Sequence, residues 1–167
     1  IAYNNCTITK SKLASIFDYL YGQYTKQRIA FLKANPHISE YASENLTFAM
    51  LNEVIASDSR FNVLEVLCHV PLRQVVKDTS LMNKYELRYA TNYSTHLDFL
   101  IINKVTKLPI LAIETDGYTY HNDQTMQHQR DLMKDHIMSS YGLPLLRLST
   151  KGSGEKEKVL SMLLQLI

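Results

Sequence analysis

The alternation of hydrophobic and polar positions divides the chain into segments with helical and strand-like periods. Over residues 1–35, apolar side chains recur at helical spacing, and Ile16, Leu20 and Tyr24 share one face. The Asn-Pro pair at 35–36 predicts a break after this segment. We interpret residues 1–35 as a helical extension, which is either a hairpin packed on the following domain or the remnant of an upstream domain.

A second helical stripe follows the break. It begins near Ser39 and ends near Asp58. Phe48, Leu51 and Ile55 lie on one face of it, which predicts an amphipathic helix.

The next part of the chain is predicted to be extended at first and then irregular. Residues 61–66 alternate between apolar and polar positions, and residues 70–76 continue the apolar pattern. We therefore predict a strand over 61–76. Residues 78–94 are polar and aromatic without a clear period, so we expect an excursion there with a short helix near 81–85.

Two almost wholly apolar segments, 97–102 and 109–114, give the clearest strand signal. Such runs are typical of strands that are buried on both faces. Only the polar turn 103–107 separates them, and so short a connection predicts an antiparallel hairpin.

The C-terminal part of the chain alternates between helix and strand. The pattern predicts a helix over 123–141 that ends at Gly142, then a buried strand over 143–148, then a last amphipathic helix. The order of elements predicts an α/β domain over residues 36–167, with a mixed central β-sheet flanked by helices on both faces.

Composition and charge place few limits on function. The 167 residues carry a net charge of +2, and the sequence pI is about 8.5, which permits a nucleic-acid partner without requiring one. No apolar run approaches the roughly 18 residues of a membrane span, so no membrane partner is expected. Cys6 and Cys68 lack metal-ligand spacing and are expected to be reduced thiols of a cytoplasmic protein. Because the chain starts at Ile1 and not at Met, we expect it to be part of something longer.

Two carboxylates interrupt the apolar hairpin. Asp98 lies inside its first strand and Glu114 ends its second, and a turn centred near Thr106 should bring the two near each other. Neighbouring carboxylates in an apolar setting are costly, and a divalent cation or a salt bridge would compensate them. The alternative is that each acid marks a strand end and is hydrogen-bonded to the backbone.

A third acid, Asp116, follows Glu114 at strand spacing and should face the same side. Gly117 permits a turn after it, and His121 lies in the loop beyond. Oxygen ligands completed by water suit Mg²⁺ or Mn²⁺ better than zinc. A zinc site built on His121 and His128 would lack a third nitrogen or sulfur ligand at a typical spacing.

The helix predicted over 123–141 carries two cations on one face. Arg130 and Lys134 are four residues apart, so they repel each other unless an anion such as a phosphate lies between them. The alternative is a solvated helix face of mixed charge.

Four blocks of this sequence together resemble the Vsr-like (very-short-patch-repair-like) branch of the PD-(D/E)XK nuclease superfamily. Members of that branch carry an aspartate in one strand, I-E-x-D-G and a downstream histidine after the next, R-D-x-x-K on a helix, and then G-x-x-x-x-R. The matching blocks are residues 97–100, 112–121, 129–135 and 141–148. The resemblance covers about residues 39–150 and implies a restriction-endonuclease-like fold.

The resemblance implies a site for one or two Mg²⁺ or Mn²⁺ ions. Asp98 and Glu114 match the two metal-binding acids of the family. Glu44 is similar to the helical glutamate that many members contribute, with Glu40 and Glu53 as rivals.

The resemblance also implies roles for basic residues and one departure. Asp116 stands where the superfamily's lysine would follow the acid, and it is expected to reach the metal through water. Lys134 matches the basic residue that can replace that lysine, and His121 matches the histidine of the branch. Either of these two would orient or deprotonate the attacking water. Arg147 matches the later arginine and, with Arg130 and Lys134, is expected to contact nucleic acid, unless it is the buried partner of an acid.

We therefore expect a metal-dependent endonuclease that hydrolyses phosphodiester bonds, with DNA as its partner and an upstream helicase domain in the full-length chain. Two alternatives stay open. A catalytically inactive module of the same fold would bind nucleic acid without cleaving it, which Asp116 in the lysine position favours. A docking domain within a larger helicase-like protein is favoured by the aromatic surface of the helix at 13–24.

Overall fold

The chain divides into two compact units, residues 1–37 and residues 38–167. The computed structural model describes residues 10–34, 37–116, 124–149 and 154–167. In the first unit, α1 (Lys10–Ala34) is one continuous helix and not a helical hairpin. The described part of the chain contains no helix with the length and apolarity that a membrane crossing requires.

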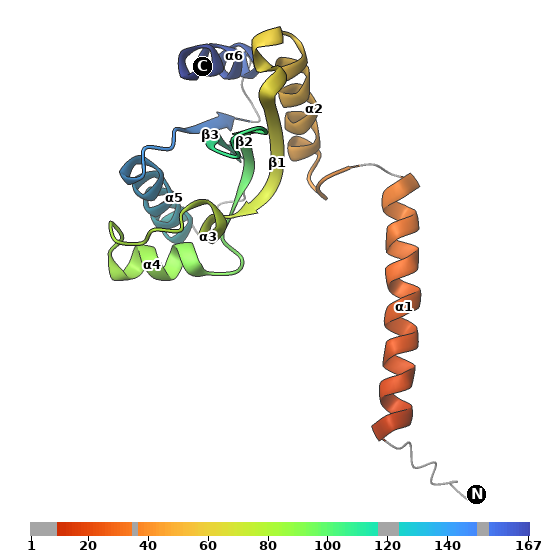
Figure 1. Ribbon diagram of the computed structural model, residues 1–167. Helices are drawn as coiled ribbons and strands as arrows, with labels where there is room; N and C mark the ends of the chain where they lie inside the picture. Colours follow the sequence, from red (N-terminus) through yellow and green to blue (C-terminus); the bar gives the residue numbers. More distant parts are fainter. Residues whose placement is uncertain (1–9, 35–36, 117–123, 150–153) are drawn as a thin grey trace, which may run out of the picture. The chain divides into compact units, whose positions relative to one another are not determined.

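A four-stranded mixed sheet forms the centre of the second unit (Figure 1). Its strands are β1 (Leu64–Pro71), β2 (His96–Asn103), β3 (Pro109–Asp116) and β4 (Leu145–Ser149). They lie in sequence order across the sheet; β2 is antiparallel to both β1 and β3, and β4 is parallel to β3. The predicted mixed sheet is therefore confirmed, and its two most apolar strands are the central ones.

The predicted hairpin between β2 and β3 is also confirmed. Its turn is held by the Asn103 side chain, whose Oδ1 accepts hydrogen bonds from the backbone N–H groups of Val105 and Thr106. Lys107 adopts a positive φ of 62°, and its backbone N–H bonds to the Asn103 carbonyl at 2.7 Å. This turn sets the register in which Phe99 lies opposite Ile113.

Helices α2 (Ala42–Ala56) and α6 (Glu155–Leu166) cover one face of the sheet (Figure 1). Leu51 and Val54 of α2 are spaced to lie on one side of the helix, and both are buried. The side chains of this core come from these two helices, the four strands and the segment before β1: Leu51, Val54, Phe61, Leu64, Phe99, Ile101, Leu111, Ile113, Leu148, Val159 and Leu163.

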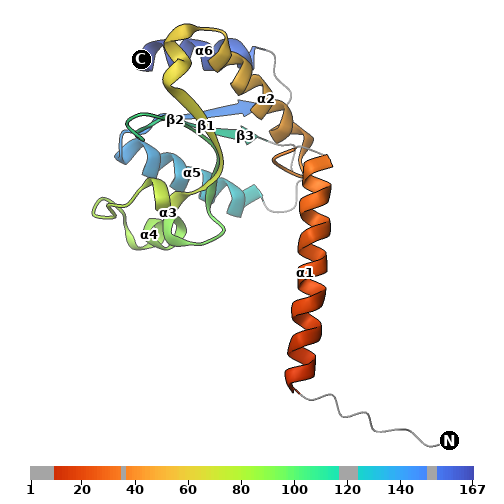
Figure 2. The same cartoon turned by 45° about the vertical axis from the view of Figure 1, so that its right-hand side comes forward.

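Helices α3 (Leu72–Val75), α4 (Lys84–Thr91) and α5 (Gln124–Ser140) cover the opposite face. Figure 2 separates the same two groups of helices in a second view. The second core contains Leu72, Val76, Ala90, Leu97, Leu100, Ile102, Ala112, Ile137, Met138 and Leu143. The sheet is buried on both faces, which explains why β2 and β3 read as continuous apolar runs.

The strand predicted over 61–76 is wrong at both ends. Residues Ser59–Val63 form a 3-10 helix, η1, because the Asp58 side chain caps it by accepting a hydrogen bond from the Arg60 N–H. At the other end, Pro71 precedes the short helix α3, and Leu72 turns into the core. Local capping and a proline overrode the apolar alternation at these positions.

The short helix expected near 81–85 lies later and is longer. Helix α4 begins at Lys84 because Asn83 and Glu86 form a reciprocal capping box. The Asn83 side chain accepts from the Glu86 N–H, and the Glu86 carboxylate accepts from the Asn83 N–H at 2.9 Å. This motif was readable from the sequence, and it fixes the start of the helix.

The helix end predicted at Gly142 is confirmed, although β4 begins at Leu145 and not at residue 143. Gly142 has a φ of +66°, and its N–H bonds to the Ser139 carbonyl. The Leu143 N–H bonds to the Met138 carbonyl at 3.0 Å. These bonds close the last turn of α5 in the way that a glycine terminator does.

Replacing Gly142 with alanine should destabilise the protein by about 1 kcal/mol, because a Cβ disfavours the left-handed conformation. A Cβ at this position would meet no heavy atom within 4 Å, so the cost is conformational and not steric. Urea unfolding would measure it. Gly142→Asn is the matched control and should lose less, since asparagine tolerates this conformation. Equal losses in both variants would contradict this explanation.

Candidate functional site

Two of the predicted acids, Asp98 and Glu114, lie in one row with Arg147 across the sheet. Glu114 on β3 pairs directly with Arg147 on β4. Asp98 precedes Phe99, which pairs with Ile113, the residue before Glu114. Asp98 therefore lies beside Glu114. On β1, Cys68 pairs with Phe99 and Val70 pairs with Leu97. His69 therefore lies opposite Asp98 and completes the row. The sheet topology therefore gathers side chains from four strands at one end of the hairpin.

The carboxylate of Asp98 is fixed on one side only. Its Oδ2 accepts hydrogen bonds from both the backbone N–H and the Oγ1 hydroxyl of Thr115, each at 2.8 Å. The backbone N–H of Asp98 donates to Glu114 Oε1 at 3.4 Å. No hydrogen bond from the described residues reaches Asp98 Oδ1, so this oxygen is available to a ligand.

Glu114 forms a buried ion pair with Lys134 of α5. Lys134 Nζ lies 2.6 Å from Glu114 Oε2 and also donates to the His96 carbonyl at 3.0 Å. Burial raises the pKa of Glu114 above its ordinary value; Lys134 opposes this shift, and the negative charge of Asp98 adds to it. The predicted catalytic lysine thus reaches the second acid from the helix and not from the strand.

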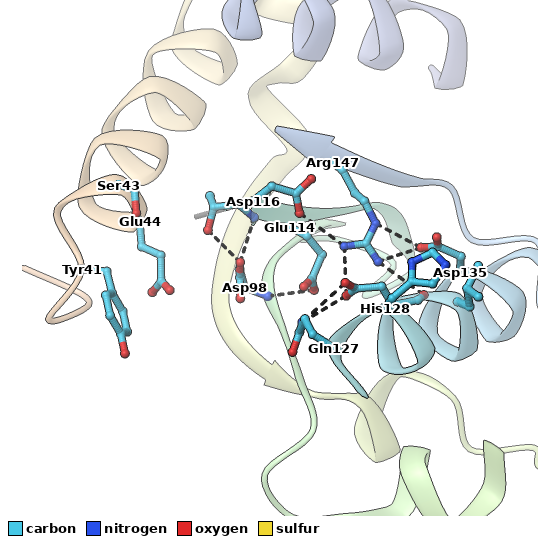
Figure 3. Close-up of a pocket in the computed structure, with 13 residues that line it drawn as sticks. Tyr41, Ser43, Glu44, Asp98, Glu114, Asp116, Gln127, His128, Asp135 and Arg147 are labelled. Carbon is cyan, nitrogen blue, oxygen red and sulfur yellow. Dashed lines mark hydrogen bonds and ion pairs between the residues drawn. The ribbon is translucent and has the colours of Figure 1, made fainter. Parts of the chain in front are cut away.

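A cavity of about 650 Å³ opens over these residues (Figure 3). Six carboxylates are among the side chains that line it: Glu44, Asp98, Glu114, Asp116, Asp131 and Asp135. Among the described lining residues, these six carboxylates face one permanent positive charge, that of Arg147, so the cavity is negatively charged. Such a cavity attracts cations and repels a bare phosphate.

Glu44 enters the cavity from α2, whereas Asp135 and His128 come from α5 on the other side (Figure 3). Glu44 Oε2 is buried and accepts no hydrogen bond within the described structure. Its nearest ionisable partner there is His69 Nε2, at 3.5 Å. The rivals for the helical glutamate lie elsewhere, since Glu53 pairs with Lys156 and Glu40 is exposed outside the cavity lining.

Two neighbouring stripes of α5 face the site. Gln127, Asp131 and Asp135 recur every four residues and line the acidic cavity. Arg130 and Lys134 form the adjacent stripe, and only Lys134 is buried. The two cations predicted on one helix face thus differ in environment: Lys134 is buried in an ion pair, and the Arg130 guanidinium is exposed.

Arg147 is held among three aspartates. Its Nη2 lies 2.8 Å from Asp135 Oδ1, and its Nη1 lies 3.4 Å from both Asp116 Oδ1 and Asp131 Oδ1. Burial lowers the pKa of Arg147, but the hydrogen bond to Asp135 and the aspartate charges outweigh burial and raise it. This geometry matches the alternative role of a partner for acids, and a nucleic-acid contact by Arg147 stays a prediction.

The structure brings the four predicted metal-binding acids, Glu44, Asp98, Glu114 and Asp116, to one cavity. Among the described residues, however, no three His, Cys, Asp or Glu side chains are grouped closely enough to hold a metal ion by themselves. His121 and Gly117 lie outside the described residues, as does Cys6. Cys68 is a free thiol.

Sequence reasoning missed several residues of the site. Thr115, which donates twice to Asp98, stands between two predicted acids and carries no motif of its own. Gln127 lines the cavity from the first turn of α5, and His128, considered from the sequence only as a zinc ligand, lines it too. The four-residue spacing from Gln127 to Asp131 and Asp135 was the signal that could have identified an acidic helix face.

Comparison with known protein families assigns this chain to a family. A family model described as a protein of unknown function, DUF2726, matches residues 40–166. The chain belongs to the DUF2726 family. The match includes every described residue of the row of side chains and of the acidic cavity. No curated protein and no solved structure matches the chain.

Removing the Lys134 charge should destabilise the protein in a pH-dependent way. In Lys134→Met, Glu114 stays buried without its cation, so its pKa in the folded state rises further. A carboxyl group with a raised pKa in the folded state adds to the free energy of unfolding at low pH, where it is protonated. This stabilisation is lost as the pH rises through the folded-state pKa. We expect a loss of about 3 kcal/mol at neutral pH and a smaller loss near pH 5, measured by urea unfolding.

The double variant Lys134→Met/Glu114→Gln is the control for this experiment. It removes the buried charge together with its partner and should recover part of the stability at neutral pH. The same loss for Lys134→Met at both pH values would show that the lysine contributes packing alone.

Proposed function

We propose that residues 38–167 form a metal-dependent nuclease domain of the PD-(D/E)XK type, close to the Vsr-like branch. The observation that carries the proposal is the contact of Lys134 with Glu114 beside Asp98. Two acids on adjacent strand ends and one basic group within reach of them are the set that phosphodiester hydrolysis by this superfamily uses. The mixed sheet with an antiparallel hairpin, a helix and a parallel strand is in keeping with a restriction-endonuclease-like fold.

The donor atoms at the site suit Mg²⁺ or Mn²⁺. Asp98 and Glu114 offer carboxylate oxygens, and these hard ligands fit such cations. Mg²⁺ is commonly held by one or two carboxylates, with water and substrate phosphate completing its shell, so three grouped protein ligands are not required. The buried Glu44 Oε2 without a hydrogen bond is a further oxygen on the same cavity, and a nearby cation would offset its burial.

A bound cation would supply an acidified water and charge stabilisation at the phosphate. The residues of the chain would do the positioning. Thr115 holds Asp98 so that Oδ1 faces away from its two hydrogen bonds. Lys134 Nζ can donate to the attacking water or to a phosphate oxygen from its place beside Glu114.

Several features of the proposal rest on the resemblance alone. They are DNA as the nucleic acid, an upstream helicase domain in the full-length protein, and a role for His121. Arg130 would contact a phosphate next to the site, since its guanidinium is exposed on the helix that carries Lys134.

Cleavage of labelled single-stranded, duplex and forked DNA in Mg²⁺ or Mn²⁺ tests the proposal. Asp98→Asn and Glu114→Gln should each lower the cleavage rate by at least about 10²-fold, because each removes a carboxylate charge with little change in shape. Glu65→Gln is the matched control: this glutamate is exposed on β1, outside the cavity, and its loss should leave the rate unchanged. EDTA should abolish cleavage by the wild-type protein.

The nuclease proposal fails if no substrate is cut in either metal, or if both acid variants cut at the wild-type rate. Cleavage that persists in EDTA would also contradict it. Circular dichroism of the two variants would establish that a lost rate does not come from a lost fold.

A second candidate is a nucleic-acid-binding module without catalytic activity. The observation that favours it is that Lys134 already neutralises Glu114, while Asp116 is paired with Arg147 in the place where the superfamily has its lysine. This candidate predicts binding of nucleic acid with no metal-dependent cleavage in the assay above.

A further inference from the structure

A second cavity, of about 300 Å³, lies on the other side of the acid pair. It shares Asp98, Glu114, Gln127 and Asp131 with the acidic cavity, so the two cavities adjoin along these residues. The side chains that distinguish its lining are hydroxyls, an amide and two cations: Tyr89, Ser94, Thr95, Asn92, Arg130 and Lys134. The acid pair therefore has a strongly anionic side and a side that offers hydrogen-bond donors.

Arg130 provides an uncommitted positive charge on the second side. It lies one helical turn before Lys134, is exposed, and forms no ion pair with any residue that the structure describes. Lys134, in contrast, is occupied by Glu114 and the His96 carbonyl. A guanidinium in this position can bind a phosphate through two parallel hydrogen bonds.

Tyr89 and Asn92 provide neutral donors at the end of α4. Burial, followed by the negative charges of Glu114 and Asp131, raises the pKa of Tyr89 to about 12, so its hydroxyl stays protonated. Asn92 Oδ1 accepts from the N–H and hydroxyl of Ser94, which directs the amide nitrogen away from these bonds. These groups can donate to the sugar and base edges of a nucleotide, which are rich in acceptors.

We propose that this second cavity binds one unpaired nucleotide next to the phosphate that Asp98 and Glu114 act on, so that the substrate strand is single-stranded there. This inference rests on the proposed nuclease function. A volume of about 300 Å³ lies at the lower end of small-molecule sites, which suits a single nucleotide better than a base pair. A base can enter a cavity of this size only when it is unpaired or extruded from the stack.

Fluorescence anisotropy of the whole chain tests the inference. The probes are a fluorescein-labelled oligothymidylate and the same strand annealed to oligoadenylate, both in Ca²⁺, which occupies oxygen sites. We expect the single strand to bind at least about tenfold more tightly than the duplex. Arg130→Ala should weaken single-strand binding by about tenfold, and Asn92→Ala by less, because a hydrogen bond to a charged group is worth more than a neutral one.

Lys104→Ala is the matched control. It removes an exposed positive charge from the turn at the opposite end of β2, outside both cavities. It should leave binding unchanged apart from the small general effect of net charge. Arg130→Lys should restore part of the affinity, since it keeps the charge without the paired donors.

Equal binding of single strand and duplex would overturn the inference, and so would equal affinities of Arg130→Ala and Lys104→Ala. An absence of binding to both probes would overturn it as well. These outcomes are separate from the nuclease proposal. Metal-dependent cleavage that does not depend on Arg130 or on strand state would leave the nuclease and remove this subsite. Arg130-dependent binding of single strands without cleavage would support the subsite and remove the nuclease.

Discussion

The buried ion pair between Glu114 and Lys134 is the interaction on which the arrangement of the site depends. An isolated charge in either position would be expensive, since both residues are about as buried as the core around them. Their mutual contact and the hydrogen bond from Lys134 to the His96 carbonyl compensate that cost. Because these three partners belong to α5, β3 and β2, the pair also joins the helix to the open end of the hairpin.

That junction determines where the other charged groups lie. With Lys134 pointing at the sheet, the neighbouring stripe of α5 places Asp131 and Asp135 near the middle of β4, where they meet Arg147. The exposed Arg130 is left on the opposite side. A single helix therefore separates an anionic cavity from one with donor groups, and the acid pair lies on the boundary between them.

The sequence carried more information about the hairpin and its acids than about their surroundings. The apolar runs and the short turn were enough to predict the register that brings Asp98 beside Glu114. The resemblance pointed to Lys134, which the structure places against the second acid. The resemblance favoured Glu44, but the sequence could not exclude Glu40 and Glu53, because all three fit one helix or its start. The choice depends on how α2 packs on the sheet.

The sequence prediction was wrong where a local turn signal interrupts the alternation of apolar and polar residues. The 3-10 turn after Asp58 and the turn at Pro71 both interrupt an apolar alternation that by itself predicts one long strand. The partners of Arg147 were equally hidden, because they lie 12 to 31 residues away and meet it only when β4 aligns parallel to β3. Long-range ion pairs of this kind follow from topology and cannot be read from spacing.

The charge distribution links metal and nucleic acid within the proposed function. Six carboxylates line the larger cavity, and the arginine among them is already paired with aspartates. A phosphate approaching this side without a cation meets net repulsion, whereas a divalent ion at Asp98 and Glu114 would reverse the local sign. Under the proposed function, the affinity for nucleic acid would then increase with metal, and by thermodynamic reciprocity the affinity for metal would increase with nucleic acid by the same factor. The donors around Arg130 would contribute on the other side of the acid pair, where two cations offset part of the negative charge.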